Sequence, residues 1–286
     1  MESKSSKLIR WIFTIPVTIY SIFLIALPLI YIFIISFFKS DSYGGMDVTF
    51  TLSNYLELFD AVYVKIFLQS FLIAIVTTAI CVLISYPFVL AVSHKSKKTQ
   101  QILMTLVMVP FLTNSLIRMY GWIVLLRKHG VINSLLFDLH LTNGPLSLMY
   151  NNLGILIGMV YTLLPFMILP LYSSVSTIDK NLLEASSDLG ASKIKTFFNI
   201  ILPSTFPGLF NGALMVFTPA LGYFFIVDVL GGGKIMILGN LIKNQFLTAR
   251  NWPFGAAISV TLLLVITVII AIYRKVGGKM DDLGGV

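Results

Sequence analysis

Long apolar runs alternate with short polar connections along the whole chain. Six of these runs reach the length of about 20 residues that an α-helix needs to cross a bilayer. They show no period-two alternation of apolar and polar positions, so helices rather than barrel strands are expected to satisfy the backbone in lipid. The expected spans are approximately 11–38, 66–92, 102–126, 153–175, 207–229 and 254–273.

The composition supports the same class of protein. Of the 286 residues, 57% are apolar and 11% are charged, whereas soluble proteins carry about 25% charged residues. The first apolar run is about twice as long as the core of a secretion signal and contains no small-residue cleavage site, so it is expected to remain as the first span. We therefore expect a single all-α integral membrane domain over residues 1–286.

The positions of Lys and Arg predict the orientation of the chain. Twelve lie in the two tails and in the second and fourth connections, whereas eight lie on the opposite side. Because cytoplasmic connections are enriched in Lys and Arg, both termini and the fourth connection are expected in the cytoplasm. The net charge of +8 follows from this topology pattern and does not indicate binding to nucleic acid.

The fourth connection, residues 179–205, is polar in a chain that is otherwise mostly hydrocarbon. Asp179 is expected to cap a helix that ends at Gly190, and Ser192 is expected to cap a second helix. Pro203 would close this second helix before the fifth span begins. The pattern predicts two short helices joined by a tight turn, whether as a partner site or as a solvated loop of no special role.

Seven residues of this connection are spaced in a recognisable pattern: Glu184, Ala185, Ser186, Gly190, Ile200, Leu202 and Pro203. The pattern resembles the EAA loop of importer-type ABC transporter permeases, which reads EAA, three residues, Gly, nine residues and I-x-L-P. Ser186 departs from it, since the family has a second Ala there. In that family the loop docks on the ATP-hydrolysing subunit. The resemblance therefore implies that residues 179–205, the coupling segment below, connect the chain to an ATPase.

Asp228 and Arg118 are ionisable residues that fall near the ends of expected spans. Counting about 1.5 Å per residue places both near the outer membrane face, where a charge in a span suggests function. Of the twelve acidic residues, eleven lie in tails or connecting loops, and Asp228 is the exception. Asp228 could contact a cationic substrate, form an ion pair with Arg118, or face interfacial water.

Aromatic residues lie near these charges in the sequence, namely Tyr120, Trp122, Tyr223, Phe224 and Phe225. Aromatic faces can bind an ammonium group through cation-π attraction. They are also typical of the aromatic belt at a membrane interface. Both interpretations stay open at this point.

No catalytic or cofactor site is expected in this chain. The glycine-rich stretch 231–234 fails as a phosphate-binding loop, because Asp228 and Ile235 stand where that motif requires Gly and Ser or Thr. The single cysteine, Cys81, lies inside an apolar run, so cysteine ligation of a metal is not expected. The acids and histidines do not cluster as a membrane enzyme would need.

Further segments resemble the spermidine/putrescine permeases within the same family. They are residues 110–122, which include Asn114, and residues 164–174, 228–234, 239–240 and 251–256. The charge and the aromatic residues described above, together with these segments, give the substrate-path candidates Asp228, Tyr223, Phe224, Trp122, Tyr120 and Asn114. The resemblance also implies a bacterial cytoplasmic membrane protein that works with a second permease, two ATPase subunits that bind ATP and Mg, and an extracellular polyamine-binding protein.

Two alternatives remain at this stage. An importer permease for another small solute, such as ferric ion, thiosulfate or an amino acid derivative, would show the same coupling pattern. An ion-coupled secondary transporter belongs to a different class and would need acids or a proton relay near the bilayer midplane. The sequence lacks such residues, which favours the importer permease.

Overall fold

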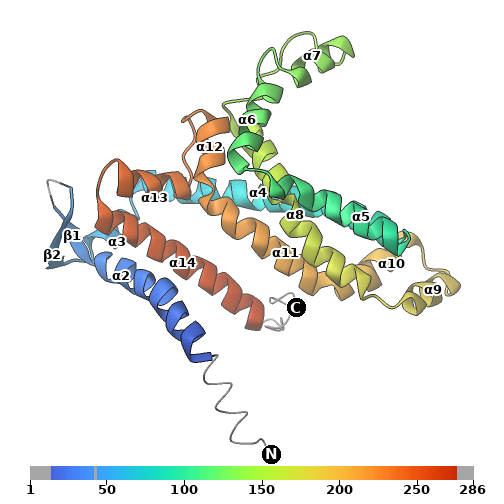
Figure 1. Ribbon diagram of the computed structural model, residues 1–286, viewed down its shortest axis with the longest axis horizontal. Coiled ribbons are helices and arrows are strands. Elements are labelled where there is room, and N and C mark those ends of the chain that lie inside the picture. Colours follow the sequence, from blue (N-terminus) through green and yellow to red (C-terminus); the bar gives the residue numbers. More distant parts are fainter. Residues whose placement is uncertain (1–13, 42–43, 276–286) are drawn as a thin grey trace, which may run out of the picture. The chain divides into compact units, whose positions relative to one another are not determined.

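The computed structural model describes residues 14–41 and 44–275, and these are almost entirely helical (Figure 1). The residues of the two tails that entered the orientation count, Lys4, Lys7, Arg10 and Lys279, lie outside the described residues. The elements are η1 (Ile22–Ala26), α2 (Leu27–Ile35), β1 (Phe38–Ser40), β2 (Met46–Phe50), α3 (Ser53–Glu57), α4 (Ala61–Ser93), α5 (Lys97–Met108), η2 (Val109–Leu112), α6 (Ser115–Leu126), α7 (Val131–Asp138), α8 (Asn152–Ser176), α9 (Lys180–Asp188), α10 (Lys193–Thr196), η3 (Phe197–Ile201), α11 (Leu202–Gly222), α12 (Phe224–Gly231), α13 (Leu238–Leu247) and α14 (Trp252–Lys275).

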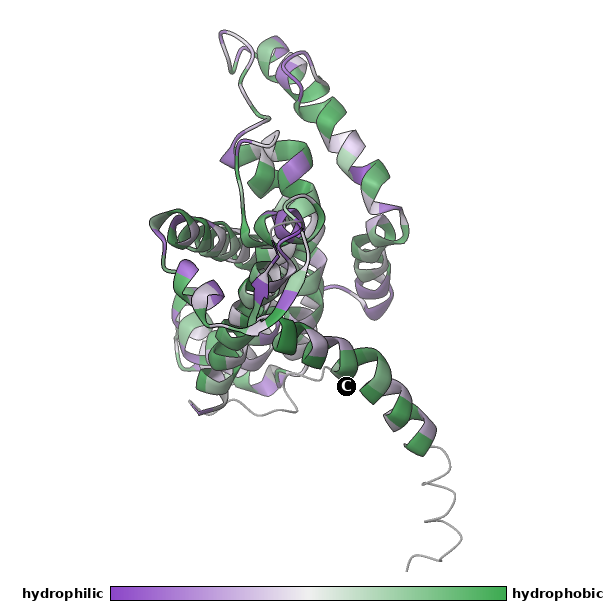
Figure 2. Cartoon of the chain, turned by 90° about the vertical axis from the view of Figure 1, so that its left-hand side faces the viewer, coloured by the Kyte–Doolittle hydropathy of each residue, from purple (hydrophilic) through white to green (hydrophobic). Residues whose placement is uncertain are grey.

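Five helices in the described part are long and apolar enough to cross a membrane, or up to six if one bent pair counts as a span. The five are Thr14–Ile35, Ala61–Ser93, Asn152–Ser176, Lys193–Gly222 and Trp252–Tyr273. Apolar residues cover these helices over most of their length (Figure 2). The fold class is therefore that of a helical integral membrane protein.

The third expected span, residues 102–126, is sharply bent. The chain bends by 94° between Lys97–Leu112 and Ser115–Asp138. Pro110 lies in the 3-10 turn η2, and Asn114 then takes an extended conformation and caps α6 by accepting a hydrogen bond from the Leu116 N–H at 2.8 Å. An Asn at an N-cap favours the start of a new helix over continuation of the old one.

The fifth expected span, residues 207–229, also differs from the structure. The helix begins already at Lys193 and ends at Gly222. Tyr223 leaves helical geometry at φ −77° and ψ 58°, and α12 follows as a separate short helix. The apolar run continues across this break, which is why hydropathy alone did not show it.

The chain divides into two compact units. Among the described residues, one comprises residues 14–41, 44–64 and 241–267, and the other comprises residues 65–240 and 268–275. In the first unit, β1 and β2 form an antiparallel hairpin that the sequence did not indicate. The Asn54 amide donates hydrogen bonds to the carbonyls of Ser36 at 2.9 Å and Phe38 at 2.8 Å and so holds the start of the hairpin to α3.

In the second unit, the most extensive helix packing joins α8 and α11. Gly208 and Gly212 of α11 are one turn apart and face α8. A Cβ at Gly208 would lie 2.7 Å from the Pro170 carbonyl oxygen, and one at Gly212 would lie 3.2 Å from the Met167 Cα. Glycine at this spacing lets two helix backbones approach closely, as is common where helices pack in lipid.

Candidate functional site

The coupling segment begins with α9. The Asp179 carboxylate accepts a hydrogen bond from the Asn181 N–H at 2.9 Å, which confirms the expected helix cap. Glu184 and Ala185 lie on the exposed side of α9, whereas Ser186 is 7% exposed. The helix therefore presents the carboxylate of Glu184 outward and turns the Ser186 hydroxyl inward.

The turn after α9 is a Schellman motif. Gly190 has φ +75°, the left-handed conformation that glycine adopts without a steric cost. The Gly190 N–H donates to the Ser187 carbonyl at 2.9 Å, and the Ala191 N–H donates to the Ser186 carbonyl at 3.0 Å. Gly190 therefore ends the helix, as the sequence predicted.

The second half of the coupling segment differs from expectation. Ser192 caps α10 by accepting a hydrogen bond from the Lys195 N–H at 3.4 Å, as expected. Pro203, however, does not close this helix, which runs on as Lys193–Gly222. A π-helical turn, η3, precedes Pro203, and the Leu202 N–H bonds to the Phe197 carbonyl five residues back. The altered bonding pattern lets the helix pass a residue that has no N–H to donate.

The coupling segment also carries exposed apolar side chains. Leu189 is 88% exposed and Ile194 is 71% exposed, on either side of the Gly190 turn. Leu182 of α9 is exposed by 53%. Apolar side chains grouped on a polar, exposed segment are typical of a surface that contacts another protein.

The base of α11 is anchored within the second unit. Tyr86 of α4 is buried, its hydroxyl lies 2.7 Å from the Thr205 hydroxyl, and its ring packs edge-on against Phe197. Ile200 and Leu202 are half-buried, and Leu202 packs on the core cluster around Tyr86. The apolar positions of the I-x-L-P pattern therefore help to hold the helix in place, while Pro203 is exposed.

Asp228 lies on α12 and is held by Asn240. The Asn240 Nδ2 donates to Asp228 Oδ1 at 2.6 Å and to the Phe224 carbonyl at 3.2 Å. The Asn240 Oδ1 accepts a hydrogen bond from the Ile237 N–H at 3.2 Å. Asn240 is 3% exposed and therefore links α12 to the start of α13 from a buried position.

Arg118 is placed near two aromatic rings. Its guanidinium carbon lies 5.1 Å from the ring centroid of Phe111 and 5.9 Å from that of Tyr161. Its Nε and Nη1 atoms are buried and have no hydrogen-bond partner among the described residues. The ion pair of Arg118 with Asp228 that the sequence suggested stays a prediction.

The other substrate-path candidates fall into different surroundings. Trp122 packs edge-on against Tyr161 at 5.2 Å, next to Arg118 on the same helix, whereas Tyr120 is 64% exposed. Tyr223 stands at the break between α11 and α12, and the carbonyl of Phe224 belongs to the Asn240 contacts. The side chain of Asn114 caps α6. The structure therefore groups Trp122 with Arg118, and Phe224 with Asp228.

Sequence reasoning placed Asn240 in a segment that resembles the permeases but gave it no role, and it missed Tyr161 and Thr196. Asn240 is a buried amide in an apolar stretch, and its polarity there was the available signal. Tyr161 and Thr196 carry no such signal, since their partners Arg118 and Ser186 are distant in sequence or across a turn.

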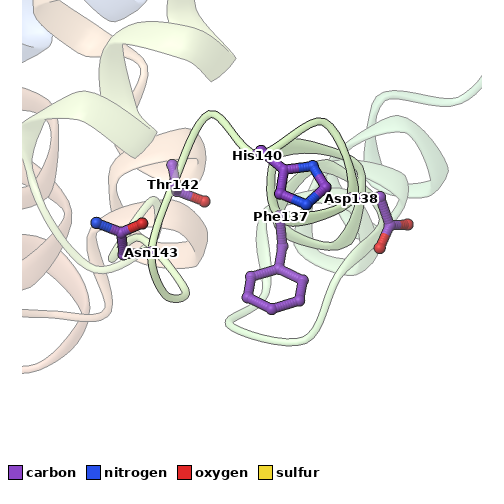
Figure 3. A pocket seen from close by; sticks show the side chains of 5 residues that line it. All are labelled: Phe137, Asp138, His140, Thr142 and Asn143. Atoms are coloured by element: carbon purple, nitrogen blue, oxygen red, sulfur yellow. The ribbon is translucent and has the colours of Figure 1, made fainter.

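The pocket with a clear lining lies apart from these residues, after α7 (Figure 3). Its lining residues are Phe137, Asp138, His140, Thr142 and Asn143, and its volume is about 350 Å³. In Figure 3 the side chains of Thr142 and Asn143 lie on the loop that follows the helix carrying Phe137 and Asp138. In the described ranges no three His, Cys, Asp or Glu side chains come together as metal ligands.

Long apolar helices, a bent helix pair and a polar helix–turn–helix between two spans are the features of a multi-span membrane protein. Residues 84–282 match the model of the family described as binding-protein-dependent transport system inner membrane component. The chain belongs to this family. Its members are inner membrane components of transport systems, so the chain is a membrane-embedded transport subunit.

Several curated relatives are similar over most of their length. The spermidine/putrescine transport system permease protein PotB of Haemophilus influenzae is 41% identical over 254 residues, which are 89% of this chain and 89% of the relative. The protein of the same name from Escherichia coli K12 is 43% identical over 249 residues, or 87% of this chain and 90% of the relative. The inner membrane ABC transporter permease protein YdcU of Escherichia coli K12 is 29% identical and covers 79% of this chain and 76% of the relative.

Solved structures agree on the fold. One is a bacterial alginate ABC transporter in complex with an alginate pentasaccharide-bound periplasmic protein. A chain of it matches with a TM-score of 0.76 and 14% identity over 95% of this chain and 96% of its own length. A second structure, of a bacterial ABC transporter for the import of alginate, has a TM-score of 0.70 and 14% identity, covering 96% of this chain and 97% of its own. At this identity the likeness supports the architecture of an importer permease and not a shared substrate.

Proposed function

We propose that this chain is a permease subunit of an ATP-driven importer that carries spermidine and putrescine into the cytoplasm. The observation that supports this most strongly is 41–43% identity over 87–90% of the chain to permeases named for spermidine and putrescine transport. Both termini and the coupling segment face the cytoplasm in this proposal, in line with the distribution of Lys and Arg.

The chain itself binds no nucleotide in this proposal. ATP and Mg are bound by two separate ATPase subunits, and a second related permease and a polyamine-binding protein complete the importer. α9 docks on an ATPase subunit through the exposed Glu184 and Ala185 and the apolar side chains of Leu182 and Leu189. Closure of the ATPase subunits around ATP would move α9, and the helix Lys193–Gly222 would pass that motion into the membrane.

Asp228 is proposed as a contact for the cationic cargo. Its carboxylate is fixed by Asn240, so a negative charge is held at a defined place on α12. A fixed carboxylate attracts an ammonium group with little cost of ordering. Trp122, which packs against Tyr161, offers a separate aromatic face that could attract an ammonium group.

Uptake of radiolabelled spermidine and putrescine tests this function. The importer would be expressed with its ATPase, second permease and binding protein, with wild-type chain or with Glu184→Lys. Glu184→Lys should abolish uptake and reduce the amount of ATPase subunit that co-purifies, while the chain still reaches the membrane. Asp138→Lys, the same charge reversal at the exposed end of α7, is the matched control and should leave uptake unchanged.

Asp228→Asn separates the cargo contact from a structural role. An amide can still accept the Asn240 hydrogen bond but carries no charge. The concentration for half-maximal uptake should therefore rise while the amount of assembled complex stays the same. If uptake depends on polyamine concentration as in the wild type, Asp228 has only a structural role.

A further inference from the structure

Ser186 is the position at which this chain departs from the EAA pattern, and its hydroxyl has a specific partner. The Ser186 Oγ lies 2.8 Å from the Thr196 Oγ1, within hydrogen-bond distance. Ser186 is 7% exposed and Thr196 is half-buried, so the contact is shielded from solvent in part. An alanine at position 186 would have no group with which to make it.

This contact spans the turn between the two halves of the coupling segment. The Ser186 carbonyl already accepts the Ala191 N–H of the Schellman turn, so Ser186 is bound through both backbone and side chain. Gly190 itself has open space around it, since no atom lies within 4 Å of a Cβ built there. Without the side-chain contact between Ser186 and Thr196, α9 could rotate relative to the following helix at the Gly190 turn, because glycine is conformationally permissive and has open space there.

Thr196 is also the last residue before the π-helical turn η3, near the start of the helix Lys193–Gly222. The next residue, Phe197, packs against the ring of Tyr86 of α4, and the hydroxyl of Tyr86 contacts Thr205 of α11. The Ser186–Thr196 contact therefore connects α9 to a part of the helix that packs against the second span, α4. A displacement of α9 would act on the helix at this position.

We propose that Ser186 and Thr196 are a positioning pair that makes α9 and the helix Lys193–Gly222 move as one body. The inference rests on the proposed docking of α9 on an ATPase. It adds a reason why movement of α9 reaches the next helix and does not merely bend the chain at Gly190. Ser186 does not itself contact ATP or cargo in this role. Loss of the pair uncouples ATP hydrolysis from uptake without releasing the ATPase.

The test is the number of polyamine molecules taken up per ATP hydrolysed, measured in proteoliposomes that hold the complete importer. Ser186→Ala and Thr196→Val each remove one hydroxyl, and the double variant removes both. The ratio should fall by roughly 2- to 30-fold, the range expected when a residue modulates coupling. The double variant should be no worse than either single variant, because the two residues act through one contact.

Ser176→Ala is the matched control. Ser176 is exposed at the end of α8, and its hydroxyl bonds to the Ser173 carbonyl of its own helix at 2.7 Å. This variant should keep the wild-type ratio. Ser186→Ala should also keep the wild-type amount of bound ATPase, whereas Glu184→Lys should lose it. Loss of the ATPase in Ser186→Ala would assign Ser186 to docking and overturn the positioning role, with the proposed function intact.

A reversible crosslink gives the sharper comparison. The variant Ser186→Cys with Thr196→Cys should form a disulfide on oxidation, and the native Cys81 is buried and does not compete. The reduced form should show the lowered ratio, and the oxidised form should return to the wild-type ratio. Equal ratios in the two forms, or failure of the disulfide to form, would overturn the inference.

A wild-type importer that hydrolyses ATP without polyamine uptake would instead contradict the proposed substrate. The two redox forms would then be compared by how strongly the binding protein stimulates hydrolysis.

Discussion

Replacement of Gly208 by alanine should destabilise the second unit, since it adds one methyl group where α8 and α11 are closest. The new Cβ would lie 2.7 Å from the Pro170 carbonyl oxygen and 2.6 Å from the Ser174 Cβ. Real Cβ atoms essentially never approach other heavy atoms within 3.0 Å. Neither of these contacts can be relieved by rotating a side chain, so the two helices must separate.

The expected loss of stability follows from the overpacking that the added methyl group causes. Overpacking of one methyl group in a well-packed interior costs about 1–3 kcal/mol. Alanine favours the helical state over glycine by about 1 kcal/mol, which offsets part of that cost. The new Cβ meets atoms that cannot rotate away, so the overpacking cost lies toward the upper end of that range. The net loss is then about 2 kcal/mol, or a factor of roughly 30 in the ratio of folded to unfolded chain.

The assay is the temperature at which half of the purified chain leaves the monodisperse peak in detergent. Gly222→Ala is the control, because Gly222 ends the same helix and a Cβ there meets nothing within 4 Å. Gly208→Ala should lower the transition temperature by several degrees relative to Gly222→Ala. Equal transition temperatures for the two variants would refute the close approach of α8 and α11.

Three further variants test other contacts by the same assay. Asn240→Ala should cost about 1–3 kcal/mol because the buried Ile237 N–H loses its acceptor, and a wild-type transition temperature would contradict that role. Arg118→Met should be neutral or stabilising, since two buried N–H groups without partners are replaced by an apolar chain of similar length; a clear loss of stability would show that the guanidinium has a partner. Tyr86→Phe should cost about 1 kcal/mol through loss of the hydroxyl contact with Thr205, and Thr205→Val in the same background should add little.

The coupling segment shows how far local sequence signals reach. Asp179, Gly190 and Ser192 were expected as two caps and a helix stop, and the structure has them in these roles. Caps and left-handed turns are decided by a few neighbouring residues, so the sequence contains the necessary information. Pro203 does not end the helix as expected, because a π-helical turn precedes it, and the residues of that turn, Phe197 and Ile201 among them, pack on a core cluster formed by distant helices.

The apolar spans were likewise determined by composition, but their interruptions were not. Hydropathy averages over about 19 residues, so it reports that a segment is apolar and not whether its backbone is continuous. The 94° bend after Leu112 and the break at Tyr223 both lie within apolar runs. Pro110 and Asn114 carried a signal for the first break, since proline and a capping residue stand close together there.

The sequence by itself determined the class of protein, the approximate spans and the local form of the coupling segment, because each depends on composition or on residues a few positions apart. Only the tertiary structure decided that Arg118 lies between Phe111 and Tyr161, that Asn240 holds Asp228, and that Ser186 meets Thr196. The physical reason is that a polar side chain in an apolar interior takes whichever partner the packing of distant helices brings within reach. That choice is made by the whole fold.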